Sequence, residues 1–195
     1  RFGHFDVVYA NAGYGLHAPM HEMSTEALRR IFDVNFFAAM ELIGEAARRL
    51  IAAKRPGHLL MCSSAAAKFA LPTFAAYSAT KSAQNHVCRA MRIELRQFGI
   101  EVSSVHPITT RTEFFNTAAV LSDNPGDAAR EVESVPRALV QTADQVAHAT
   151  VRCLRHPRPE VWTSFLVRFA AGVATICPTL FDVLALRISK QRGRL

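Results

Sequence analysis

The amino-acid sequence predicts an α/β fold in which helices cover both faces of a doubly wound parallel sheet. Short apolar runs alternate with segments long enough to form helices. This order is expected of parallel strands joined by helical crossovers. Polar residues follow directly after three of these runs, and ligands of such sheets bind beyond the carboxyl ends of the strands. The same pattern therefore predicts where a site would lie.

The first predicted strand covers residues 5–10, an apolar run closed by the loop residues 11–13. Ser24 suits the N-cap of a long helix that runs to about residue 53. Pro56 and Gly57 follow, and neither residue favours continuation of a helix. A first crossover from strand to helix is therefore expected over the first quarter of the chain.

The second predicted strand covers residues 58–62 and ends at Ser63 and Ser64. A loop containing Pro72 precedes a predicted helix over residues 74–98, which Gly99 ends. This helix carries Tyr77 and Lys81.

The third predicted strand covers residues 100–105 and ends at His106-Pro107. Residues 113–141 read as irregular to helical, either as a flap over a site or as a plain surface excursion. Thr142 suits the N-cap of a helix to about residue 154, and residues 160–163 form a last short predicted strand.

Tyr77, Lys81 and Ser64 are the most informative side chains in the sequence. Tyr77 and Lys81 stand four residues apart, so on a helix they project from one face, one turn apart. A free phenol has a pKa of about 10, and a nearby cation lowers it by favouring the phenolate. We therefore expect Lys81 to lower the pKa of Tyr77, and Ser64 to hydrogen-bond the oxygen that exchanges the proton. An ordinary surface helix is the alternative interpretation.

Composition excludes several other kinds of protein. The net charge is +7, but the basic residues are scattered without interleaved aromatic side chains, so we expect no nucleic-acid partner. The four cysteines are far apart and no histidine stands at metal-ligand spacing. We therefore expect no disulfide framework, no metal site and a reducing, cytoplasmic setting.

At these residues the chain resembles the short-chain dehydrogenase/reductase family, over nearly its whole length. Ser64, Tyr77 and Lys81 match the family's catalytic serine, tyrosine and lysine, and Asn35 stands where its active-site asparagine lies. The resemblance implies hydride transfer between NAD or NADP and a carbonyl or secondary alcohol. It makes Tyr77 the general acid/base and Ser64 the group that polarises the substrate oxygen. Tyr77 and Lys81 would also contact the cofactor, Lys81 at the nicotinamide ribose, and Asn35 would hold a water linked to Lys81.

The resemblance also implies two further cofactor-binding segments. Asn11-Ala12-Gly13 resembles the family's turn after its fourth strand and would line the ribose on the adenosine side. The stretch after residue 106 resembles the family's nicotinamide-contacting segment, with Pro107, Ile108, Thr110 and Thr112 as the candidate residues. Ile108 replaces the glycine expected there, and its branched side chain restricts a close approach to a ligand.

The family's first three strands and its glycine-rich phosphate loop would precede Arg1. The glycines of this chain form no Gly-x-x-x-Gly-x-Gly pattern. We therefore expect residues 1–195 to be a single, partial Rossmann-like domain, the C-terminal two thirds of the whole. Alone, such a polypeptide should be inactive and prone to association. Both NAD and NADP remain open as cofactors, because the residue that discriminates them belongs to the preceding portion.

Residues 165–195 form an apolar, helical C-terminal segment with a basic end that includes Lys190, Arg192 and Arg194. Its uncharged stretch, residues 169–181, holds 13 residues, fewer than the roughly 20 that a spanning helix needs. Three interpretations stay open: a helix that covers substrate or is buried in a homo-oligomer, a helix lying in an anionic membrane surface, and a spanning helix.

Together these features predict an oxidoreductase acting on a small carbonyl or alcohol. Apolar residues between Ser64 and Tyr77, namely Phe69, Leu71, Pro72 and Phe74, favour an apolar substrate. The alternative is a non-catalytic or membrane-associated interaction protein that keeps the same sheet.

Overall fold

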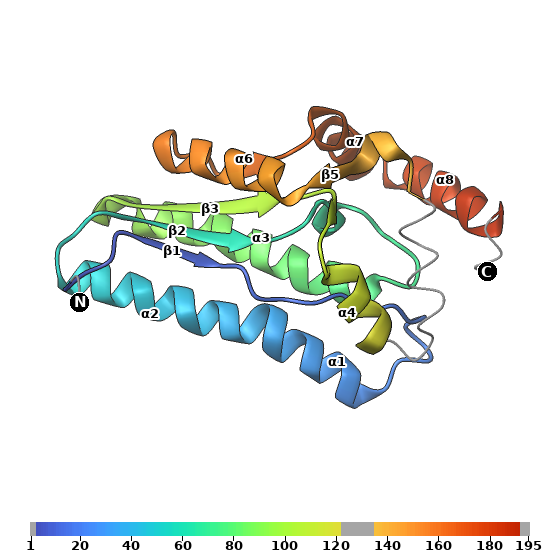
Figure 1. Ribbon diagram of the computed structural model, residues 1–195, viewed down its shortest axis with the longest axis horizontal. Helices are drawn as coiled ribbons and strands as arrows, with labels where there is room; N and C mark the ends of the chain where they lie inside the picture. Colours follow the sequence, from blue (N-terminus) through green and yellow to red (C-terminus); the bar gives the residue numbers. More distant parts are fainter. Residues whose placement is uncertain (1–2, 122–134, 192–195) are drawn as a thin grey trace.

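The computed structural model describes residues 3–121 and 135–191 (Figure 1). At its centre is a four-stranded, all-parallel sheet in the order β1-β2-β3-β6. The strands are β1 (Val7–Ala10), β2 (Gly57–Cys62), β3 (Ile100–His106) and β6 (Glu160–Trp162). The predicted parallel sheet and all four of its predicted strands are therefore confirmed, with shifts of one or two residues at their ends.

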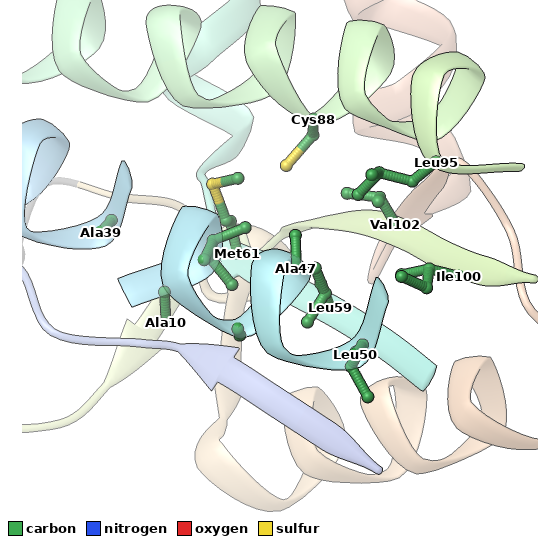
Figure 2. Packing of buried hydrophobic residues seen from close by; sticks show 12 residues of the cluster. Ala10, Ala39, Ala47, Leu50, Leu59, Met61, Cys88, Leu95, Ile100 and Val102 are labelled. Carbon is green, nitrogen blue, oxygen red and sulfur yellow. The ribbon is translucent and has the colours of Figure 1, made fainter. Parts of the chain in front are cut away.

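Helices cover both faces of this sheet, as a doubly wound fold requires. On one face, α2 (Ala38–Ala52) and α3 (Ala75–Leu95) enclose the largest core cluster, part of which Figure 2 shows. That cluster joins Ile43 and Leu50 of α2 to Leu59 and Val102 of the strands. On the other face, α6 (Ala143–Arg155) packs Cys153 against Leu60 and Val105.

The helix predicted after Ser24 contains an interruption that the sequence did not reveal. It begins as α1 (Thr25–Phe32), where Ser24 Oγ accepts a hydrogen bond from Ala27 N at 3.1 Å. A π-helical turn over residues 33–37 then joins α1 to α2. Such a turn adds a residue to the helix and often marks a functional site. Here it carries Asn35, whose side chain is fully buried.

The helix α3 and a following 3₁₀ turn (Arg96–Phe98) cover the residues predicted as one helix. Gly99 ends it with φ +70°, a backbone conformation that side chains other than glycine rarely adopt. Another 3₁₀ turn (Ala65–Lys68) follows Ser64 and connects β2 to the loop before α3.

The stretch between β3 and α6 contains a small second sheet that the sequence did not predict. Its strands are β4 (Thr109–Arg111) and β5 (Val140–Thr142), which pair in parallel. Between them lie α4 (Phe114–Leu121) and a 3₁₀ turn (Arg137–Leu139). Residues 122–134, which belong to the predicted flap, lie outside the described residues. The irregular to helical prediction for 113–141 is therefore wrong at β5.

The C-terminal segment is a bent pair of helices. α7 (Phe165–Ile176) begins after Ser164, α8 (Pro178–Gln191) begins at a proline, and their axes differ by 114°. Proline has no N–H to continue the hydrogen bonds of α7, so the break falls there. Within the described residues no helix can cross a membrane alone, although the bent pair has the length and composition to do so. Arg192 and Arg194 of the predicted basic end lie outside the described residues.

Candidate active site

The carboxyl end of β2 sets the position of Ser64 beside α3. Ser63 Oγ donates to the carbonyl of Lys81 at 2.8 Å, which ties the end of the strand to the helix. Ser64 Oγ accepts from Ala66 N at 3.1 Å, and Ala65 N donates to the carbonyl of Pro107 at 2.9 Å. The ends of β2 and β3 are therefore held together, as expected for a site at the edge of a parallel sheet.

Tyr77 lies in the first turn of α3 and is 8% exposed. The Ser64 side chain lies near enough to the phenol to influence its pKa. Its ring contacts Phe74, with centroids 6.0 Å apart, and Phe114 of α4, with centroids 5.5 Å apart. Burial raises the pKa of Tyr77 above its ordinary value, and the nearby Ser64 side chain opposes that rise only in part.

Lys81 lies one turn along α3, with Nζ 5.8 Å from the centre of the Tyr77 ring. This ammonium donates to the carbonyl of Cys62 at 2.7 Å. Burial lowers the pKa of Lys81. The predicted proximity of Tyr77, Lys81 and Ser64 is present. However, the expected lowering of the Tyr77 pKa is wrong for this structure, because burial of the phenol outweighs the influence of its neighbours.

Asn35 connects the loop after β1 to α3. Its Oδ1 accepts from Tyr14 N at 2.9 Å, while Nδ2 donates to the Tyr14 carbonyl at 2.9 Å and to Thr80 Oγ1 at 3.2 Å. The main-chain carbonyl of Asn35 accepts from Gln84 Nε2. These bonds hold the loop against the helix that carries Tyr77. The water-holding role of Asn35 stays a prediction.

The loop of Asn11, Ala12 and Gly13 is exposed at the end of β1. A Cβ atom at Gly13 would lie 3.0 Å from Asn35 Oδ1 and 3.2 Å from Lys81 Nζ. Only glycine allows the backbone to approach these two side chains so closely. Gly13 thus lies within the cluster of predicted site residues. Within the described residues, no hydrogen bond joins Asn11 or Ala12 to this cluster.

In the segment from Pro107 to Thr112, the threonine side chains form hydrogen bonds to neighbouring protein groups. Thr110 Oγ1 donates to the Ile108 carbonyl at 2.8 Å and accepts from Gln141 Nε2 at 2.9 Å. Thr112 Oγ1 accepts from Phe114 N at 3.3 Å. These bonds shape β4, the β4–β5 pair and the start of α4. The predicted cofactor contacts of this segment stay predictions.

His106, which the sequence did not single out as functional, contacts the main-chain carbonyl of Ser64. The imidazole is fully buried, stacks on Trp162 with centroids 4.6 Å apart, and has Nδ1 3.0 Å from the Ser64 carbonyl. The only signal in the sequence is its position directly before Pro107, at the end of a buried strand.

The neighbours of His106 determine its tautomer. In the orientation of the Asn85 amide that satisfies its surroundings, Oδ1 accepts from Lys68 Nζ at 2.8 Å. Its Nδ2 then donates to His106 Nε2 at 3.2 Å. His106 Nε2 is therefore an acceptor, so the proton lies on Nδ1 and is donated to the Ser64 carbonyl. Burial lowers the pKa of His106 to about 4, which favours this neutral form.

Glu160 of β6 completes this polar network. Its carboxylate lies 3.4 Å from Lys68 Nζ and 3.4 Å from an Arg89 guanidinium nitrogen, and it accepts from Trp162 Nε1 at 2.9 Å. Burial opposes its ionisation, but the hydrogen bond from Trp162 and the positive charge of Lys68 outweigh burial. The pKa of Glu160 is therefore lowered to about 2.

Within residues 3–121 and 135–191, no three histidine, cysteine or acidic side chains are grouped as metal ligands would be. The cysteines at positions 62, 88, 153 and 177 are free thiols.

Comparison with known proteins identifies related sequences. Residues 1–120 match the family model described as short chain dehydrogenase. The uncharacterized oxidoreductase YbbO of Escherichia coli (strain K12) is 36% identical over 152 residues, which cover 74% of this chain and 54% of that protein. D-erythrulose reductase of Gallus gallus is 30% identical over 147 residues, covering 75% and 58% respectively. The chain thus spans about half the length of the curated relatives it matches.

Solved structures share the fold at low sequence identity. A short-chain dehydrogenase from Sphingobium yanoikuyae in complex with NADPH has a TM-score of 0.74 at 20% identity, covering 92% of this chain and 66% of that one. One from Mycobacterium paratuberculosis, bound to NAD, has a TM-score of 0.67 at 23% identity, covering 82% and 63%. These similarities confirm the predicted Rossmann-like fold class.

Proposed function

This chain belongs to the short-chain dehydrogenase family, and we propose that it carries the acid/base half of an oxidoreductase that interconverts a carbonyl and a secondary alcohol. One observation carries the proposal: the Tyr77 phenol lies beside the Ser64 side chain, with the Lys81 ammonium 5.8 Å from the centre of its ring. This arrangement suits proton exchange at a substrate oxygen bound next to both hydroxyls.

The raised pKa of Tyr77 keeps its phenol protonated at neutral pH. A protonated phenol can give its proton to the oxyanion that forms when a carbonyl is reduced. Ser64 Oγ–H, beside the same phenol, can donate to that oxygen and stabilise its developing charge. His106 holds the Ser64 peptide in place through Nδ1, which makes it a positioning residue rather than a catalytic one.

The residues around Gly13 fit a dinucleotide. Gly13 leaves open the space that a Cβ would fill between Asn35 and Lys81, and the neighbouring Asn11 and Ala12 are exposed. An ammonium has three N–H donors, so the bond of Lys81 to the Cys62 carbonyl leaves capacity for ribose hydroxyls. A nicotinamide cofactor, when bound, supplies the hydride. Pro107, Ile108, Thr110 and Thr112 are the proposed contacts on its nicotinamide side.

Both NAD and NADP are proposed as cofactors, because relatives with this fold include proteins bound to each. Fluorescence titration of the full-length protein with NADH and with NADPH tests this point. Saturable binding of one or both is expected, and Gly13→Val should weaken it by filling the space beside Lys81. A folded protein that binds neither would support the non-catalytic alternative instead.

The substrate is proposed to be a small apolar carbonyl or alcohol. The loop between Ser64 and Tyr77 presents Phe69, whose ring lies 5.1 Å from that of Phe181 in α8. The C-terminal helices therefore lie beside this loop, and we propose that they cover the bound substrate. A panel of aldehydes and ketones of rising chain length, assayed by NADH or NADPH oxidation, should show kcat/KM increasing with apolar area.

Exposed apolar residues on α7 and α8 favour an additional contact, either in a homo-oligomer or with a membrane. Phe165 is 83% exposed and Ile176 81%. We propose a cytoplasmic protein that associates peripherally with membranes through residues 165–195.

A further inference from the structure

A cavity of about 230 Å³ lies where the end of α6, β6 and the start of α7 meet. Three arginines line it: Arg152 of α6, Arg158 of the turn that follows, and Arg168 of α7. All three are exposed residues. The cavity is therefore a cationic depression open to the surface.

The charges of these arginines are not balanced by nearby acids. Glu160 is the one carboxylate among the lining residues, and it already pairs with Lys68 and Arg89. Over the part of the chain that the structure describes, no ion pair involves any of the three arginines. Guanidinium groups gathered without acids repel one another. Their planar donors match phosphate geometry, so a phosphate group would relieve the repulsion.

Exposed apolar side chains adjoin this cavity on α7. Phe165 both lines the cavity and is 83% exposed, while Leu166 is 67% and Phe169 65% exposed. Phe165 and Phe169 are four residues apart, so they are neighbours on one face of the helix. Large exposed apolar patches next to polar residues mark interaction sites. Ile176 and Leu180 continue the exposed apolar surface to α8, at 81% and 64%.

We propose that the corner of α6, β6 and α7 is a docking surface for an anionic phospholipid membrane. A headgroup phosphate binds among Arg152, Arg158 and Arg168, and Phe165 and Phe169 enter the boundary between headgroups and acyl chains. The 114° bend between α7 and α8 suits helices that lie in the membrane surface. This docking surface rests on the proposed membrane association and not on the proposed catalysis, so the two proposals can fail separately.

Charge complementarity favours a lipid surface over a second copy of the chain. A two-fold interface places the same patch on both partners, so the arginines of both copies would be brought together in one interface. An anionic membrane offers the opposite charge together with an apolar layer, and it attracts basic residues at its surface. The surface therefore has both features that a peripheral membrane contact requires.

Co-sedimentation of the full-length protein with vesicles tests the proposal. Vesicles of phosphatidylcholine alone are compared with vesicles that also contain phosphatidylglycerol. The test variant combines Arg152→Gln, Arg158→Gln and Arg168→Gln. A matched control, Arg29→Gln, Arg30→Gln and Lys54→Gln, removes the same charge from exposed residues on the α1–α2 side of the sheet. Circular dichroism verifies that both variants are folded.

The wild type should bind anionic vesicles and bind neutral ones weakly. A cation near an anionic surface contributes about fivefold in partitioning, so the three substitutions should weaken binding on the order of 100-fold. The control should lose much less, and Phe165→Ser with Phe169→Ser should weaken binding to both vesicle types. Tyr77→Phe should bind like the wild type, which separates this result from any failure of the catalytic proposal.

Three outcomes would overturn the proposal. Equal losses in the arginine variant and its control would mean that only net charge matters. Release of the protein from anionic vesicles by inorganic phosphate, at a concentration equal to that of lipid phosphate, would indicate a small-anion site instead. A dimer in sedimentation velocity that Phe165→Ser dissociates, with vesicle binding unchanged, would make this surface a subunit interface.

Discussion

Acid should destabilise this protein through His106, and burial of the imidazole sets the size of the effect. The folded protein lowers the pKa of His106 to about 4, whereas the unfolded chain has a pKa of about 6.5. Between these values the unfolded state binds the proton more readily than the folded state. The stabilisation from neutral His106 is therefore complete above pH 6.5 and is lost as the pH falls toward 4.

The two pKa values give the magnitude of this loss. Lowering the pH from 7 to 4.5 protonates His106 in nearly all unfolded chains but in only about a quarter of folded ones. The linkage relation converts this difference into about 2 kcal/mol of lost free energy of unfolding. Glu160 keeps most of its contribution over this interval, because that contribution is lost only between the unfolded pKa of about 4.3 and the folded pKa of about 2.

Urea unfolding at pH 7 and at pH 4.5 measures the effect in the wild type and in His106→Asn. An asparagine amide can still donate to the Ser64 carbonyl, but it does not titrate. The variant should therefore lose about 2 kcal/mol less than the wild type between the two pH values. His21→Asn is the matched control, because the His21 side chain is 81% exposed; it should behave like the wild type. Equal pH dependence in the wild type and His106→Asn would refute the reasoning.

Three further substitutions test other parts of the structure. Gly13→Ala places a Cβ 3.0 Å from Asn35 Oδ1 and 3.2 Å from Lys81 Nζ. Thermal unfolding should show that the free energy of unfolding falls by about 1 kcal/mol or more. An unchanged Tm would contradict the close packing of Gly13 against these two side chains. Ser64→Ala should lower kcat by about 100-fold or more with the NADH or NADPH Kd unchanged, and near-normal kcat would remove Ser64 from the proton-exchange site. Thr142→Ala removes the capping box at the start of α6 and should lower the free energy of unfolding in urea by about 1 kcal/mol. The variant should keep full activity. A folded but inactive variant would mean that this helix start contributes to the site.

Sequence patterns predicted the sheet because its strands are strongly patterned. Residues 58–62 and 100–105 are buried runs bounded by Pro, Gly and polar residues, and such signals are local. The same holds for the caps at Ser24 and Thr142, where side-chain oxygens accept the expected backbone hydrogen bonds. The spacing of Ser64, Tyr77 and Lys81 likewise predicted a cluster that the fold brings together.

Features that depend on tertiary contacts were not predicted. The π turn at residues 33–37 is shaped by the bonds of Asn35 to Tyr14 and Thr80, which are distant in sequence. Strands β4 and β5 have three residues each, too few to show an alternating pattern. The direction of the Tyr77 pKa shift depends on how deeply the fold buries the phenol. The network around His106 gathers residues from α3, β3 and β6.

Turnover of Tyr77→Phe in the full-length protein tests the central claim most directly. The substitution removes only the phenolic oxygen that exchanges a proton beside Ser64. With NADH or NADPH and a reducible carbonyl, we predict that kcat falls by about 10²- to 10⁴-fold while the cofactor Kd changes far less. A folded Tyr77→Phe variant that retains wild-type kcat would contradict the assignment of Tyr77 as the proton donor.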